Sequence, residues 1–226
     1  MKGVVKNGAP ASLEDWLSLE NEEWKPTYGS FSGAPKHQTH EALLKEQGGV
    51  CVYCGKRLSL DRSDSHIEHF RPQTTYNATT PPDLTLDYYN LIVSCGPNDL
   101  PIGHQDRKPV ICGEAKSDWF DENEHVHPAD QNCPERFSYG LSGAALAADP
   151  QDGAANRMIE VLRLNDDSLV YERGVLLTGL EEAIVSGEID LTTKEGDIAF
   201  FQSVDESDRL PDLGHVAVRY LQVELL

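Results

Sequence analysis

Hydrophobic positions recur at helical spacing in the last third of the chain. Between 152 and 164 the apolar residues fall three and four positions apart, which predicts an amphipathic helix. A second helix is expected to begin at Asp167, whose side chain is able to cap it. A final helix is expected after Pro211, ending at Leu225.

The middle of the chain has a different pattern. The segment 65–72 (SHIEHFRP) alternates polar and apolar residues, which is typical of a hairpin strand. The segment 86–95 (LDYYNLIVSC) predicts one short aromatic and apolar element, and 50–55 predicts a short strand entering a cysteine turn. A helix is expected over 36–47, ended by two glycines at 48–49.

These elements predict an α+β fold in which a small β-containing metal module lies inside a mostly helical scaffold. The module spans 36–116. The segment 1–35 reads as a leader that packs on the core, and 117–226 as an acidic, mainly helical region for partner docking. Within that region, residues 117–150 are expected to be irregular, because they lack a clear period.

The composition is that of a globular protein: 226 residues, 39% hydrophobic and 25% charged. No segment approaches the roughly 18 consecutive apolar residues that a membrane helix needs. The N-terminal segment has no apolar stretch typical of a secretory signal. We therefore expect a cytoplasmic protein that does not contact membranes.

Charge is distributed unevenly along the chain. The net charge is −19, yet the segment 36–116 is almost neutral, and 117–226 holds 7 basic and 23 acidic residues. A nucleic-acid binder that acts alone is normally basic, because phosphate neutralisation supplies much of its affinity. The total charge therefore argues against unaided DNA binding, whereas the acidic region suits a basic partner.

Five cysteines in a chain without an export signal argue against a disulfide framework. Cys51-x-x-Cys54 is able to grip one Zn²⁺ from a tight turn, and Cys95 is able to close the site from a second element. The alternative is a set of buried structural thiols.

Glu68-His69 places a carboxylate directly beside an imidazole. Neighbours on a strand point to opposite faces, so both reach one phosphate only at a strand end, which Phe70-Arg71-Pro72 supplies. A carboxylate that holds Mg²⁺ and a histidine that activates water suit phosphodiester hydrolysis. The alternative is a Glu–His pair at the surface.

The ordered motifs CVYCGKRLS, HIEHFRPQ, LDYYNLIVSC and GHQDRK resemble an HNH endonuclease of the ββα-metal type. They are most similar to the nuclease subunit family of Septu anti-phage systems, PtuB, which also occurs with some retrons. The resemblance covers roughly 36–175.

The resemblance implies a role for each matching residue. His69 corresponds to the general base, and Asn90 to the Asn that pins the hairpin loop so that the base is aimed correctly. Glu68 and His104 correspond to the ligands of a catalytic Mg²⁺ or Mn²⁺. It also implies a nucleic-acid substrate, either DNA or transfer RNA, and a PtuA-type ATPase partner.

Some residues near the motifs are less clearly assigned. Arg71 and Lys108 are candidate phosphate contacts, with solvated surface charge as the alternative. His66 precedes His69 by three positions on one strand, so the two face opposite sides and we assign His66 no catalytic role.

The sequence departs from the family pattern at the zinc site. The family often has a cysteine two residues before the histidine at 104, and here that residue is Ile102. Three zinc ligands remain, and the fourth is Cys112, another group, or none if the site is a packed thiol cluster. Cys133 reads as a packing residue.

Three functions follow for comparison. The first is a metal-dependent HNH nuclease acting in an anti-phage complex. The second is a non-enzymatic, zinc-stabilised adaptor of an ATPase, which would have no need of a base beside an oxygen ligand. The third is a stand-alone restriction-type nuclease, which the charge of −19 disfavours.

Overall fold

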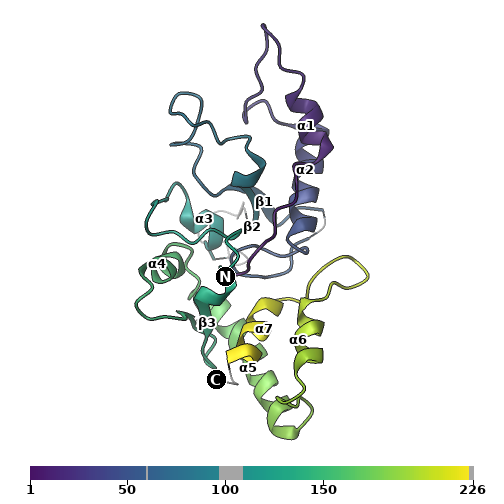
Figure 1. Ribbon diagram of the computed structural model, residues 1–226, viewed down its shortest axis with the longest axis vertical. Coiled ribbons are helices and arrows are strands. Elements are labelled where there is room, and N and C mark those ends of the chain that lie inside the picture. Colours follow the sequence, from purple (N-terminus) through teal and green to yellow (C-terminus); the bar gives the residue numbers. More distant parts are fainter. Residues whose placement is uncertain (60, 97–108, 224–226) are drawn as a thin grey trace.

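The hairpin predicted by the polar–apolar alternation lies at the centre of the molecule (Figure 1). A computed structural model describes residues 1–59, 61–96 and 109–223. Strand β1 (Ser65–His69) pairs antiparallel with β2 (Leu91–Cys95), with His69 opposite Leu91. Figure 1 shows helices α2 (Gly33–Glu46) and α3 (Cys112–Lys116) on either side of the hairpin, and both contact β2.

The predicted element over 86–95 is two elements. A 3₁₀ turn, η1 (Tyr88–Asn90), capped by the side chain of Asp87, leads directly into β2. The strand begins with apolar residues that are completely buried, because helices cover the sheet. The turn places Asn90 one residue before the strand.

The predicted helix 36–47 is confirmed as α2, which begins three residues earlier than expected. It ends before Gly48 and Gly49, both with φ near +70°, a conformation that favours glycine. Gln47 then borders β2: its amide donates to the Val93 carbonyl and its carbonyl accepts from the Val93 N–H. This contact covers the edge of the strand.

The expectation for 50–55 is half right: the cysteine turn is present, but the short strand leading into it is not. Val50 forms only an isolated bridge with Arg57, and residues 52–54 form a turn. The Gly55 N–H donates to the Cys51 carbonyl, and Gly55 has φ of 75°. A tight turn, unlike a strand, brings two thiols separated by two residues to the same side.

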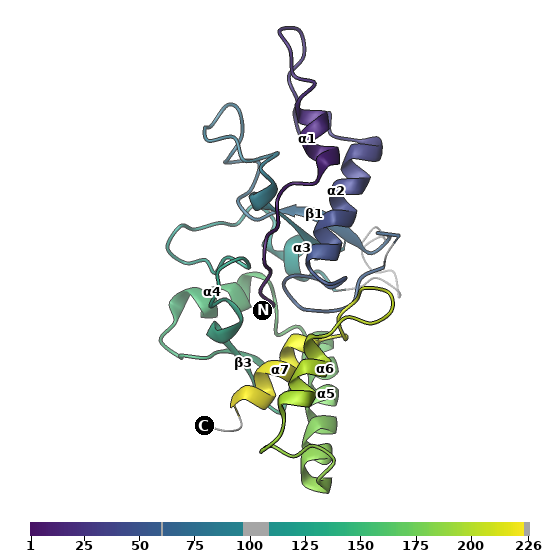
Figure 2. The same ribbon diagram turned by 45° about the vertical axis from the view of Figure 1, so that its right-hand side comes forward.

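The N-terminal segment runs along the hairpin and ends in α1 (Ala11–Leu17), as Figures 1 and 2 show. The Lys2 N–H donates to the Val52 carbonyl, and the Lys6 ammonium donates to the Leu91 carbonyl at 2.9 Å. The ring of Trp16 packs at 4.9 Å from that of Phe31. Buried residues of this segment belong to the same hydrophobic core as the hairpin.

The segment 117–150 is not irregular throughout, which corrects the expectation. It holds the 3₁₀ turn η2 (Pro134–Arg136) and a second antiparallel hairpin, β3 (Phe137–Tyr139) with β4 (Ala145–Ala147). Strands of three residues are too short to give a detectable alternation.

Four helices follow, and three of them were predicted: α4 (Gly153–Val161), α5 (Asp167–Ser186) and α7 (Gly214–Val223). The predicted helix end at Leu225 lies outside the described residues. The residue that caps α5 is Asp166, whose side chain accepts from the Ser168 N–H, and not Asp167. The fourth helix, α6 (Glu195–Gln202), was not predicted.

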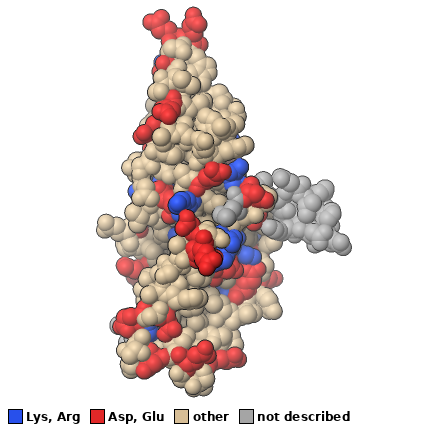
Figure 3. Space-filling view, turned by 90° about the vertical axis from the view of Figure 1, so that its right-hand side faces the viewer, with Lys and Arg blue, Asp and Glu red and all other residues tan. Residues whose placement is uncertain are grey.

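Acidic side chains are spread along the whole face in Figure 3, its two ends included, while Lys and Arg lie mainly near its middle. Among the helices of the described residues, none is long and apolar enough to cross a membrane.

Candidate functional site

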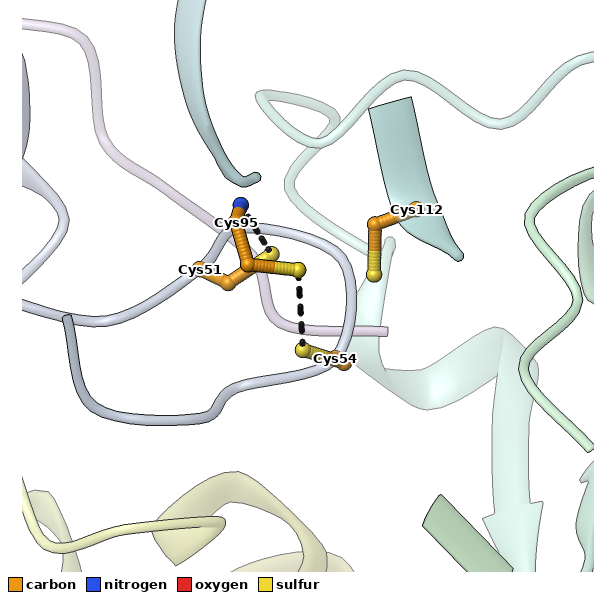
Figure 4. A group of neighbouring side chains, drawn as sticks. All are labelled: Cys51, Cys54, Cys95 and Cys112. Carbon is orange, nitrogen blue, oxygen red and sulfur yellow. Dashed lines mark hydrogen bonds between the residues drawn. The ribbon is translucent and has the colours of Figure 1, made fainter. Parts of the chain in front are cut away.

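Four cysteines from three different elements meet beside the central hairpin (Figure 4). Cys51 and Cys54 come from the turn, Cys95 from the end of β2, and Cys112 from the start of α3. All four sulfur atoms lie within 4.8 Å of one another. Figure 4 shows the sulfurs pointing toward one common centre.

This geometry fits a tetrahedral metal centre. With Zn–S bonds near 2.3 Å, sulfurs around zinc are separated by about 3.8 Å, and the Cys54 and Cys95 sulfurs here are 4.0 Å apart. Cys51, Cys54 and Cys112 are almost fully buried. Four thiols around one point, three of them buried and Cys95 partly buried, match the ligand set of a closed, structural zinc site.

The cluster favours thiolate at one position. Burial opposes ionisation of Cys51, but hydrogen bonds from Cys112, Cys54 and Cys95 outweigh it and hold the pKa of Cys51 well below its usual value. The backbone N–H of Cys95 also donates to the Cys51 sulfur at 3.4 Å. The pKa values of Cys95 and Cys112 are raised well above the usual value by their contacts with Cys51 and by burial, so the thiols by themselves favour one thiolate among neutral neighbours.

Cys112 supplies the fourth position that the sequence left open. Its backbone N–H donates to the Leu162 carbonyl at 2.9 Å, and it adopts φ of 56°, which turns the chain into α3.

Position 102 lies outside the described residues. Cys133 is buried outside the cluster, as expected for packing, and burial raises its pKa to about 11.

His69 ends β1 on the face opposite Glu68. Its Nε2–H donates to the Thr85 carbonyl at 2.9 Å, which leaves the lone pair on Nδ1. The ring of Tyr28 lies edge-on at 4.3 Å between centroids. Burial lowers the pKa of His69 below its ordinary value, so the imidazole is neutral at pH 7 and able to accept a proton.

Asn90 clamps the loop that follows His69. Its Oδ1 accepts from the Arg71 N–H at 2.8 Å. Its Nδ2 donates to the carbonyls of Arg71 and Leu84, each at 3.0 Å. The Phe70 N–H donates to the Asn90 carbonyl. Asn90 therefore ties down the residues on both sides of the loop that carries Thr85.

Glu68 faces α3 and is held by two basic groups. Its Oε1 accepts from the Lys116 ammonium at 2.9 Å, and its Oε2 lies 3.6 Å from Nε2 of His66. Burial opposes the charging of His66, but the hydrogen bond and charge of Glu68 outweigh it and raise the pKa of His66. His66 thus faces away from His69, as predicted, and beside Glu68.

Of the two candidate phosphate contacts, Arg71 is among the described residues and Lys108 is not. The Arg71 guanidinium pairs with Glu122 at 3.1 Å and stacks on the rings of Tyr76 and Phe120. The Arg71 side chain therefore already has an ion-pair partner and ring contacts, and about one-third of it is exposed to solvent. The predicted metal ligand His104 and the predicted phosphate contact Lys108 both lie outside the described residues.

Sequence reasoning missed three residues of the site. Lys116 belongs to no motif, Thr85 contributes a backbone carbonyl, and Tyr28 lies in the segment 1–35 that was expected only to pack on the core. Carbonyl contacts leave no signal in residue type. The one available signal was the spacing of Cys112 and Lys116, four apart and hence on one helical face.

No family model matches the chain. The chain is 28% identical over 175 residues to a protein of Vibrio cholerae serotype O1 biovar El Tor named "Retron Vc95 putative HNH endonuclease". The alignment covers 74% of this chain and 78% of that protein. Since the segment 36–116 is shorter than the alignment, the similarity extends beyond the cysteine and Glu68-His69 motifs.

Proposed function

We propose that this protein is an HNH endonuclease that hydrolyses phosphodiester bonds in nucleic acid. The observation that carries the proposal is the state of His69: a neutral imidazole at a strand end, with Nε2–H held by the Thr85 carbonyl and Nδ1 left to accept a proton. The similarity to the Vibrio cholerae retron protein supports the same activity.

In this proposal His69 is the general base. Its Nδ1 takes a proton from water, the water oxygen forms a bond to phosphorus, and the bond from phosphorus to the leaving sugar oxygen breaks. The Thr85 carbonyl keeps the ring in one tautomer and orients it. Asn90 positions the base by holding the loop on both sides, and Arg71 is a phosphate contact after exchanging Glu122 for substrate.

Glu68 is the proposed ligand of a catalytic Mg²⁺ or Mn²⁺, together with His104. The Oε2 atom of Glu68 offers the hard oxygen that both ions prefer. A divalent cation there supplies charge stabilisation to the phosphate and the leaving oxygen. The four cysteines hold a structural Zn²⁺ in the same proposal.

The proposed setting is an anti-phage complex, as in retron and Septu systems, with a PtuA-type ATPase as partner. The net charge of −16 over 117–226 supports a basic partner and disfavours unaided approach to DNA. The substrate is DNA or transfer RNA.

The test is cleavage of plasmid DNA and of total transfer RNA in Mg²⁺ and in Mn²⁺, with wild type beside His69→Ala. A positioned general base accelerates hydrolysis by about 10²–10⁴-fold, so the variant is expected to lose cleavage by that factor. His37→Ala removes an exposed imidazole on α2 and is the matched control, expected to cut like wild type.

Cleavage that persists in His69→Ala would reject the assignment of the base. If wild type cuts neither substrate, the assay is repeated with a PtuA-type ATPase added. Cleavage that then depends on His69 supports a nuclease that waits for its partner. Continued silence supports the zinc-stabilised adaptor instead.

A further inference from the structure

One turn of helix connects the cysteine cluster to the strand that carries the proposed base. Helix α3 begins at Cys112, which faces the other three sulfurs, and ends at Lys116, which reaches Glu68. Between them, the Gly113 N–H donates to the Ser94 hydroxyl at 2.9 Å. The helix is therefore held at its start, middle and end by the central hairpin and the cysteine cluster.

Lys116 is a buried cation with three acceptors. Its side chain is 1% exposed. The ammonium donates to Glu68 Oε1 at 2.9 Å, to the His69 carbonyl at 3.2 Å and to the Ser117 carbonyl at 3.3 Å. A lysine ammonium has three hydrogens, so this environment satisfies all of them without water.

We propose that Lys116 is a positioning residue that aligns Glu68 and His69 for cleavage, an inference that rests on the proposed nuclease function. Lys116 holds Oε1, and a catalytic cation at Oε2 would take the place of the contact with Nε2 of His66 at 3.6 Å. By holding the His69 carbonyl, Lys116 fixes the backbone from which the base projects. One side chain thus orients a carboxylate and an imidazole that face opposite sides of the strand.

The fit of α3 against the strand is close enough for this role. A Cβ added to Gly113 would lie 3.0 Å from Glu68 Oε2 and 3.0 Å from the Ser94 hydroxyl. Such contacts are tighter than ordinary van der Waals separation, so a side chain at position 113 would force Glu68 or Ser94 to shift by a few tenths of an ångström. Cys112, in the thiol cluster, anchors the start of the same turn.

The decisive variant is Lys116→Met, which keeps the length of the side chain and removes its charge. Cleavage is expected to fall about 10–100-fold, the usual loss when a residue that orients a metal ligand is removed. Mn²⁺ affinity, measured by electron paramagnetic resonance of free Mn²⁺, is expected to rise at least about threefold, because a positive charge beside Glu68 is gone. A residue that only supports the fold would lower both together.

Two further variants keep the inference testable if Lys116→Met folds poorly. Gly113→Ala keeps the charge and displaces α3, and it is expected to slow cleavage with bound zinc unchanged. Lys194→Met removes another buried lysine, whose ammonium donates to the Leu221 carbonyl in the distant helical region. This control is expected to lower the melting temperature and leave the cleavage rate and Mn²⁺ affinity of the folded protein unchanged.

Wild-type cleavage in folded Lys116→Met, or weaker Mn²⁺ binding there, would overturn the positioning role while leaving the nuclease proposal intact. If Lys116→Met does not fold, wild-type cleavage in Gly113→Ala would overturn it. Failure of the nuclease proposal has a different signature, since His69→Ala would then behave like wild type. Mn²⁺ binding is measured without substrate and so remains informative in that case.

Discussion

The cysteine cluster and the Glu68-His69 strand end both border the central hairpin, but their side chains are arranged differently. In the cluster, four like ligands converge on one point, and all four are in the described residues. At the strand end, neighbouring side chains point to opposite faces, and each is held by a different segment of the chain.

The difference separates a site that stabilises from a site that reacts. A closed set of four thiols leaves no position for substrate, which is typical of structural zinc. At the strand end, the hydrogen bond to Thr85 leaves Nδ1 of His69 for another partner, and Oε2 of Glu68 has a histidine, His66, as its neighbour at 3.6 Å. The first region should therefore respond to mutation in stability, and the second in activity.

The largest expected effect is on the cluster. Cys112→Ser removes one of the four proposed zinc ligands, and structural zinc in small modules is worth roughly 10–16 kcal/mol at neutral pH. Even a fraction of that loss is visible, because each kcal/mol shifts the melting temperature by about 2–4 °C in a chain of this size. We expect lost zinc by elemental analysis and a melting temperature lower by about 10 °C or more.

Cys133→Ser is the matched control, because Cys133 is equally buried and lies outside the cluster. It is expected to keep one zinc per chain. A Cys112→Ser protein that melts like wild type with its zinc retained would remove Cys112 from the ligand set.

A smaller effect, on cleavage, is expected from changing Asn90, whose side chain holds Arg71 and Leu84. Asn90→Asp keeps the acceptor for the Arg71 N–H but faces two carbonyls with a carboxylate in place of an NH₂ group. Losing buried hydrogen bonds in this way costs about 1–3 kcal/mol each, and the loop carrying Thr85 is expected to loosen. Cleavage should fall about 10–100-fold in folded protein, as for other residues that orient a catalytic group.

Asn156 offers the control for that clamp, since its amide also donates to two carbonyls, those of Pro150 and Asp152, but on the exposed face of α4. Asn156→Asp should leave cleavage unchanged. Equal cleavage by Asn90→Asp and wild type would show that the loop does not orient His69.

The smallest expected effect is the response to pH. Burial lowers the pKa of His69 below 6.5, so Nδ1 is unprotonated from about pH 6.5 upward. Cleavage measured at saturating substrate is expected to be level above pH 6.5 and to fall as pH drops through the lowered pKa. Stability follows the same sign, because the unfolded chain binds the proton more tightly below pH 6.5.

An acidic limb that lies above pH 7 in the cleavage profile would contradict a base with a lowered pKa. His69→Ala supplies the reference, because its residual cleavage should lack this limb. Zinc content should be measured at each pH as well. Unchanged zinc content would show that the loss of cleavage comes from His69 and not from loss of metal by the cysteine cluster.

Sequence reasoning succeeded where a local period or a residue type carries the information. Alternation identified β1, helical spacing identified α4 and α5, and glycine or proline at a helix end identified α2 and α7. The short elements β3, β4 and α6 were not predicted, and the strand expected to lead into the cysteine turn within 50–55 is not formed. Short elements depend on the surfaces they pack against more than on their own pattern.

The site divides in the same way. Residue types alone identified three of the clustered cysteines and the Glu68-His69 pair, because thiols and an imidazole beside a carboxylate are chemically distinctive. Cys112 was one of the alternatives for the fourth position, and only the tertiary structure, which brings α3 against the hairpin, places it in the cluster and places Lys116 beside Glu68. Residues far apart in sequence meet through packing, and a single sequence carries no direct record of which pairs meet.

The sequence by itself determined the chemical groups available to this protein: soft thiols, a hard carboxylate, an imidazole, and an acidic C-terminal half. The tertiary structure decided how they are used. It converged four sulfurs, gave the proton of His69 to Nε2 through the Thr85 carbonyl, and aimed one oxygen of Glu68 at Lys116. The physical reason is that ligand geometry and tautomer depend on distances of a few ångströms, which only the folded chain defines.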